Sequence, residues 1–202
     1  MRATRFALLF SFLLVAGFVS AAQRIDYVTE EEEDLIRDAQ GLQLRAPAFL
    51  KLLDNRVVAL GLRGRTSKER EQTKKDIADY ERDKKEIEKY KVEGAELRAK
   101  PLNPDIYLRN TTRPELLRGY MQIVDELMDN IDDAYDHHQD VRDSIESLQK
   151  FLTEQLPRLK KFEPKTPSET SAVKATISHS EQALEDIQKA LKSVPKTEKK
   201  SR

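Results

Sequence analysis

The chain has 202 residues and no cysteine, and its 36 basic residues balance its 36 acidic residues. The absence of cysteine excludes disulfide bonds, thiol catalysis, thiolate metal ligation and a lipid-modified N-terminal cysteine. The balanced charge gives no overall bias toward nucleic acid or an anionic membrane, while 36% charged against 6% aromatic residues is typical of long helices and coiled coils.

Residues 1–22 have the pattern of a secretory signal peptide. Arg2 and Arg5 give a positive start, residues 6–19 form a nearly unbroken apolar run, and small residues follow at 20–22. The run is shorter than the roughly 20 residues that a membrane-spanning helix needs, so we expect cleavage, with an uncleaved anchor as the alternative. The sequence therefore predicts a secreted or periplasmic protein with no transmembrane segment after cleavage.

The first helix of the mature chain is expected over residues 29–45. Thr29 and Glu32 have the spacing of a capping box, in which each side chain binds the other residue's backbone amide. The acidic cluster over residues 30–34 suits the positive end of a helix dipole. These signals predict a helix that begins directly after Thr29.

A second and more apolar helix is expected over residues 47–60. Pro47 is expected either to begin this helix or to kink a single long one, because proline lacks the amide that an interior helical position uses. Gly61 and Gly64 are expected to end it, since glycine readily adopts the left-handed conformation of a helix C-terminus.

A third helix, over residues 67–99, is expected to be only partly buried. Its apolar residues are sparse and form a narrow stripe, and Glu-to-Lys pairs four residues apart lie between them. We expect part of this helix to project as an arm or to pair with another chain. The following residues, 100–113, are expected to form an ordered connection that covers one end of a bundle, with an exposed docking loop as the alternative.

A single helix about 60 Å long is expected over residues 114–156. Apolar residues recur every seven positions, which is typical of a coiled coil. His138 falls in the same repeat, where a polar residue is expected to fix helix register rather than to carry chemistry. The residues that we expect to mediate assembly are Leu117, Val124, Ile131, Ile145 and Leu152.

The last helix is expected over residues 167–194, and a basic, disordered tail over residues 196–202. Thr166, Pro167 and Glu169 combine three signals of a helix N-terminus. The fold class predicted for residues 23–195 is all-α. We expect an elongated antiparallel bundle or coiled coil of three long helices, with the shorter and more apolar N-terminal pair packed against it.

One group of residues has the composition of a divalent-cation site. Asp129, Asp133 and His137 are four residues apart and share a helix face, and Asp140 follows. The heptad register places the aspartates of this segment on the outer face, however, and interior metal sites need ligands that point inward. We therefore predict no metal and no cofactor, and keep a cation-binding bundle that uses these four residues as an alternative.

Charge is segregated along the chain although it is balanced overall. Residues 56–75 hold seven basic and two acidic residues, and residues 125–143 hold eight acidic residues and one arginine. We expect such helices to face each other, within one chain or across a dimer. The alternative is that the basic segment contacts a partner, and the candidate contact residues are Arg63, Arg65, Lys68 and Arg70.

The sequence carries no catalytic motif and no motif that identifies a family. It has no Gly-x-Ser-x-Gly elbow, no His-Glu-x-x-His, no phosphate-binding glycine loop and no dinucleotide fingerprint. We therefore expect an exported, non-enzymatic interaction or structural protein that acts through coiled-coil surfaces, binding a protein partner or itself and not nucleic acid. The alternatives are a cation-binding bundle and a protein that binds peripherally to an anionic envelope surface.

Overall fold

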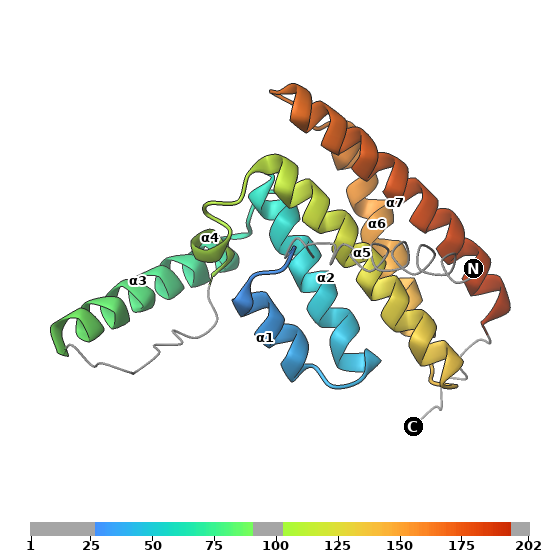
Figure 1. The fold of residues 1–202 in the computed structure, drawn as a ribbon, viewed down its shortest axis with the longest axis horizontal. Coiled ribbons are helices and arrows are strands. Elements are labelled where there is room, and N and C mark those ends of the chain that lie inside the picture. The colour runs from blue at the N-terminus through green and yellow to red at the C-terminus, as the bar shows by residue number, and fades with distance from the viewer. Residues whose placement is uncertain (1–26, 91–102, 195–202) are drawn as a thin grey trace, which may run out of the picture.

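The computed structural model describes residues 27–90 and 103–194, and all regular secondary structure within these ranges is helical (Figure 1). The helices are α1 (Glu30–Asp38), α2 (Leu42–Ala59), α3 (Ser67–Tyr90), α4 (Pro104–Tyr107), α5 (Arg113–Asp136), α6 (Arg142–Lys160) and α7 (Pro167–Ser193). The all-α prediction is confirmed. The expected signal peptide, the end of the third helix and the basic tail lie outside the described residues.

Four helices enclose the hydrophobic core. Helix α5 packs against α2 and α7, and α6 packs against α7 and α2, while the short helices α1 and α4 contact α2. The apolar character of the α2 sequence is explained by this position, because α2 is covered by neighbours on several sides (Figure 1). Fully buried core side chains include Phe49, Leu53, Leu117, Ile123, Leu127, Leu148 and Leu152.

The prediction of one continuous helix over residues 114–156 is wrong, because α5 ends at Asp136 and α6 begins at Arg142. The amide of His138 donates to the carbonyl of Tyr135 and the amide of Gln139 donates to that of Ala134, both at 2.9 Å. His138 itself has a φ of +58°. This pair of bonds around a left-handed residue is a Schellman C-cap.

His138 is therefore an exposed turn residue and has no position in a coiled-coil core. Between Ala134 and Val141 no side chain is buried, so nothing in this stretch opposes the turn. The apolar residues keep their seven-residue spacing in the sequence across the turn, but they lie on two separate helices. Helix α6 also extends past Pro157, which lies inside it, because the buried Leu159 holds the last turn in the core.

The N-terminal helical pair divides at Gly41 and not at Pro47. Gly41 has a φ of +79° and precedes α2, whereas Pro47 lies inside α2. Burial of Ala46 and Phe49 on either side of the proline keeps this turn helical despite the missing amide. At the other end, Gly61 has a φ of +74° and forms a second Schellman C-cap, so its predicted role is confirmed.

Two helix N-termini follow the sequence closely. Thr29 and Glu32 form the predicted capping box at α1. At α7, the Thr166 hydroxyl accepts a 3.1 Å hydrogen bond from the amide of Glu169, and Pro167 is the first helical residue. Both helices therefore begin where their local chemistry predicts, although the Glu169 carboxylate accepts from the backbone amide of Lys165 and from Arg113 and does not complete a capping box with Thr166.

Helix α3 projects from the bundle as an arm, as its narrow apolar stripe predicts (Figure 1). It is absent from the closely packed helix pairs, and Ile77 is 37% exposed. Local contacts support the helix instead, such as the 2.9 Å ion pair between Arg82 and Asp79. No helix in the described ranges combines the length and the apolar character needed to cross a membrane.

Candidate functional site

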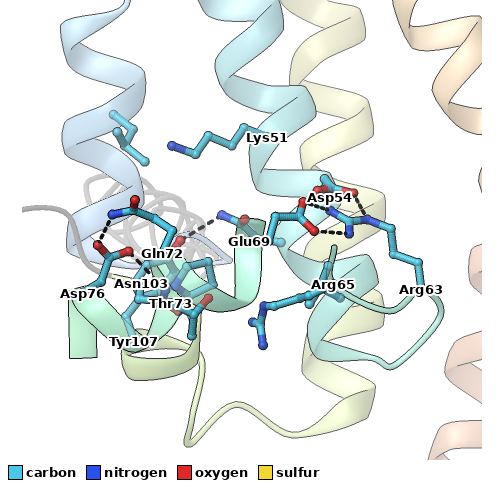
Figure 2. Close-up of a pocket in the computed structure, with 14 residues that line it drawn as sticks. Lys51, Asp54, Arg63, Arg65, Glu69, Gln72, Thr73, Asp76, Asn103 and Tyr107 are labelled. Atoms are coloured by element: carbon cyan, nitrogen blue, oxygen red, sulfur yellow. Dashed lines mark hydrogen bonds and ion pairs between the residues drawn. The ribbon is translucent and has the colours of Figure 1, made fainter. Parts of the chain in front are cut away.

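A charged cleft of about 350 Å³ lies where helix α3 leaves the bundle (Figure 2). Its lining comes from α1, α2, α3, α4 and the loop between α2 and α3. Two of the predicted contact residues, Arg63 and Arg65, belong to this lining. The other polar side chains include Lys51, Asp54, Asn55, Glu69, Gln72, Asp76, Asn103 and Tyr107.

Arg63 connects the bundle to the arm. Its guanidinium binds both carboxylate oxygens of Asp54 on α2, with Nε 2.7 Å from Oδ1, and both of Glu69 on α3 at 3.0 and 3.1 Å. These bonds raise the pKa of Arg63 and, together with the amide of Thr66, lower the pKa of Glu69 to about 2. One arginine thus fixes the first turn of the arm against α2.

A second set of contacts joins α4 to the same cleft. Arg65 forms an ion pair with Asp105, and the side-chain Nδ2 of Asn103 donates to Asp76 of α3 at 3.3 Å. The side-chain Nδ2 of Asn55 donates to the Tyr107 hydroxyl at 3.0 Å, and burial raises the pKa of this phenol. The polar groups of the cleft are thus largely engaged with each other, as in a joint between two parts of a molecule.

The four predicted contact residues divide into two groups. Arg63 and Arg65 are partly buried and paired within the chain, with acidic residues of α2, α3 and α4 rather than with the acidic segment 125–143. Lys68 and Arg70 are exposed on the first turns of α3. Within the part of the chain that the structure describes, this second group forms no ion pair.

The heptad residues that we expected to mediate assembly are in the interior of the chain's own bundle. All five are at most 6% exposed, and they contact α2, α6 and α7 neighbours through the common core. An intermolecular contact would therefore use other side chains. The five are Leu117, Val124, Ile131, Ile145 and Leu152.

The four cation-site candidates lie on the exposed surface around the end of α5. His137 Nδ1 is 2.7 Å from the carbonyl oxygen of Asp133 and 3.6 Å from its carboxylate, while Asp140 accepts a bond from the amide of Arg142. Asp129 is exposed one turn before Asp133. Across the described ranges, no three His, Cys, Asp or Glu side chains are placed to hold a metal ion.

The hydrogen bond from His137 to the Asp133 carbonyl, together with the Asp133 charge, raises the pKa of the imidazole. A protonated histidine at this position also suits the negative end of the α5 dipole. The contacts of His137 are therefore those of a helix C-cap residue and not those of a metal ligand.

The sequence did not predict a buried ion pair between Glu32 and Arg56. Both Glu32 oxygens lie 2.7 Å from the Arg56 guanidinium, which also donates to the carbonyl of Tyr27 at 2.6 Å. The two residues are 0% and 2% exposed. The sequence does contain one signal for this pair: Arg56 falls on the same helix face as the apolar Phe49 and Leu52. An arginine on a buried face requires an acidic partner.

Gly119 of α5 allows this ion pair to be buried. A Cβ atom at Gly119 would lie 2.9 Å from Arg56 Nε and 3.3 Å from the carbonyl oxygen of Tyr27. The ion pair and the Tyr27 bond thus join helix α1 and the segment before it to helix α2, at a point where α5 packs closely against them.

Comparisons of the chain with protein-family models, curated proteins and solved structures give no match. The two features that distinguish the molecule are the projecting helix α3 and the charged joint that holds its base (Figure 2).

Proposed function

We propose that this protein is an exported, non-enzymatic interaction protein that presents helix α3 as a docking arm on a helical bundle. The observation that carries the proposal is that α3 is 24 residues long and is not among the packed helix pairs. The core formed by α2, α5, α6 and α7 is closed without it. A helix that contributes so little to its own core is best explained by contacts with another molecule.

The joint at the base of α3 supports this role. Arg63 joins Asp54 to Glu69, and Arg65 pairs with Asp105, so the first turn of the arm has a defined direction. A docking element that is held in place loses less conformational entropy when it binds than a free segment does. The joint therefore favours recognition over a role as a passive linker.

The paired state of the cleft favours a non-enzymatic role. Asp54, Glu69 and Asp76 are each hydrogen-bonded to a neighbouring side chain. A general acid or base needs a proton-transfer group that can reach a substrate. The carboxylates here are bound to arginine or amide groups, which suits a structural contact.

The pattern of residues 1–22 supports export, because a positive start, a short apolar run and small residues occur in that order. Export is tested by expressing the full chain in a secretory host, fractionating the cells and sequencing the N-terminus of the product. We expect an N-terminus at Ala22 or Gln23 outside the cytoplasm. Recovery of the intact N-terminus in the cytoplasm would contradict export.

The docking role of α3 is tested with a photo-cross-linking amino acid placed at Ile77 on the arm or at Lys174 on α7. Both positions are exposed, but only the first lies on the projecting helix. We expect discrete cross-linked products from position 77 and few from position 174. Equal yields at the two positions, or none at position 77, would overturn the docking role.

A further inference from the structure

Two exposed patches of opposite charge lie on helices that do not pack together. The basic patch, on the first turns of α3, consists of Lys68, Arg70, Lys74 and Lys75. The acidic patch, on the last turns of α5, consists of Asp129, Asp132, Asp133 and Asp136. Helices α3 and α5 are not a packed pair, and Figure 1 shows α3 leaving the bundle on the side away from the end of α5.

Neither patch is neutralised within the described part of the chain. The four basic side chains form no ion pair there, and the ion pairs of the acidic patch amount to the contact between Asp133 and His137. The acidic residues are three or four positions apart, so they repel one another on one helix face. Burial and the charges of Asp129 and Asp136 raise the pKa of Asp132, which is consistent with this repulsion.

Each patch also has an exposed apolar residue beside it. Among the described residues, the exposed large hydrophobic side chains are Leu44, Ile77 and Tyr135. Ile77 lies three residues after Lys74 on α3, and Tyr135 lies between Asp132 and Asp136 on α5. A basic surface with an isoleucine and an acidic surface with a tyrosine are complementary in charge and can bury apolar area when they meet.

We infer that helix α3 of one copy docks on the end of helix α5 of a second copy, with the basic patch against the acidic patch. This inference rests on the proposed function, in which α3 is the docking arm. From the sequence, the charged helices are expected to face each other either within one chain or across a dimer. Because α3 does not pack against α5 in the same chain, the contact across a dimer is the one that we infer. Each copy carries both patches, so a twofold dimer satisfies all four at once.

The test is a charge exchange between the two patches. One variant carries Lys74→Glu and Lys75→Glu, and the other carries Asp132→Lys and Asp136→Lys. All four positions are exposed, so both variants should fold, which circular dichroism melting checks. A matched control carries Lys150→Glu and Lys174→Glu, which change the same charge at exposed positions of α6 and α7.

Analytical ultracentrifugation at low salt measures the dimer. We expect the wild type and the control to dimerise, with an affinity that falls as salt rises. Each patch variant alone removes the net charge of one patch and sets its two new side chains against like charges on the other, so it should dimerise roughly tenfold more weakly or not at all. An equimolar mixture of the two variants should restore the dimer, because each altered patch then meets its complement.

A monomeric wild type, dimerisation of both variants at wild-type strength, or a mixture that stays monomeric would overturn the inference. The proposed function is judged separately by cross-linking at Ile77. If the wild type is monomeric and the cross-linked products contain only other proteins, the docking role of α3 is supported and the dimer is contradicted. If the wild type is monomeric and position 77 gives no products, both the dimer and the docking role of α3 are contradicted.

Discussion

Helices α3 and α7 have similar lengths, 24 and 27 residues, but they are stabilised in opposite ways. Helix α7 buries Val173, Ala183 and Ile187 against α5 and α6, whereas α3 has few buried contacts and is supported by its cap, its side-chain pairs and the joint at its base. Packing stabilises a helix more than local pairs do. The contrast indicates that the bundle carries most of the stability, which leaves α3 available for the docking role that we propose.

The same contrast separates the two arginine sites. In the bundle, Arg56 and Glu32 are removed from water, while at the base of the arm Arg63 remains 20% exposed and Glu69 41% exposed. Desolvation makes an unpaired charge costly in the first site, and water screens the charges in the second. The two sites should therefore respond very differently to the loss of one partner.

The largest expected effect follows from Glu32→Ala. This change leaves the Arg56 charge buried without its partner and should lower the free energy of unfolding by about 3–5 kcal/mol. The matched control is Glu71→Ala on the arm, where the glutamate is exposed and the change should stay within about 0.5 kcal/mol. Urea denaturation followed by circular dichroism measures both. Equal losses of stability in the two variants would contradict the distinction between a buried ion pair in the bundle and exposed charges on the arm.

Gly119→Ala should have the next largest effect. The new methyl group would lie 2.9 Å from Arg56 Nε, and Arg56 cannot move aside without loss of its bonds to Glu32. We expect a loss of about 1–3 kcal/mol in the free energy of unfolding. The control is Gly64→Ala near the base of the arm, where nothing lies within 4 Å of the added Cβ. A Gly119→Ala variant as stable as the control would show that Gly119 is not required for close packing.

A smaller effect of opposite sign is expected at the turn between α5 and α6. His138→Gly relieves a left-handed conformation and should raise the free energy of unfolding by about 0.5–1 kcal/mol. In a continuous helix the same change would lower it by about 1 kcal/mol, because glycine disfavours helix interiors. Gly61→Ala at the equivalent position of the α2 C-cap is the reciprocal control and should be destabilising. Thermal melting of both variants decides the sign.

The two C-caps also explain how far the sequence could predict the fold. The end of α2 was predictable because Gly61 is the usual residue for a left-handed cap, while His138 fills the same position without that signal. The interval from Ile131 to Ile145 spans two heptads, so the turn between them leaves the periodic pattern intact. Apolar spacing identifies buried positions but does not show whether one helix or two supply them.

The candidate site was predictable only as a set of charges. The run of basic residues selects Arg63 and Arg65, but their acidic partners are found only when α2, α3 and α4 meet. Likewise, Glu32 has a local role in the α1 capping box that hides its contact with Arg56, 24 residues further along the chain. Pairings of this kind depend on tertiary structure, which local propensity does not specify.

The smallest effect concerns pH and the base of the arm. The pKa of Glu69 is lowered from 4.5 to about 2, chiefly by its hydrogen bonds with Arg63. Because the folded value is below the ordinary one, the contribution of Glu69 to stability is present above pH 4.5 and is lost as the pH falls through about 2. The carboxyl carbon of Glu69 should therefore titrate near pH 2 in an NMR experiment, and the α3 cap should persist at pH 3.

The variant Arg63→Met distinguishes the effect of the arginine on the pKa of Glu69 from the effect of the helix cap. The variant should return the Glu69 midpoint toward 4.5, while the bonds between Glu69 and the Thr66 amide keep part of the shift. Because water screens the pair of Arg63, 20% exposed, and Glu69, 41% exposed, global unfolding should change little, but cross-linking from position 77 should become less specific if the joint directs the arm. An unchanged midpoint would assign the shift to the cap alone. The direction of α3 would then depend on its contact with the start of α4, the hydrogen bond from the Asn103 side chain to Asp76.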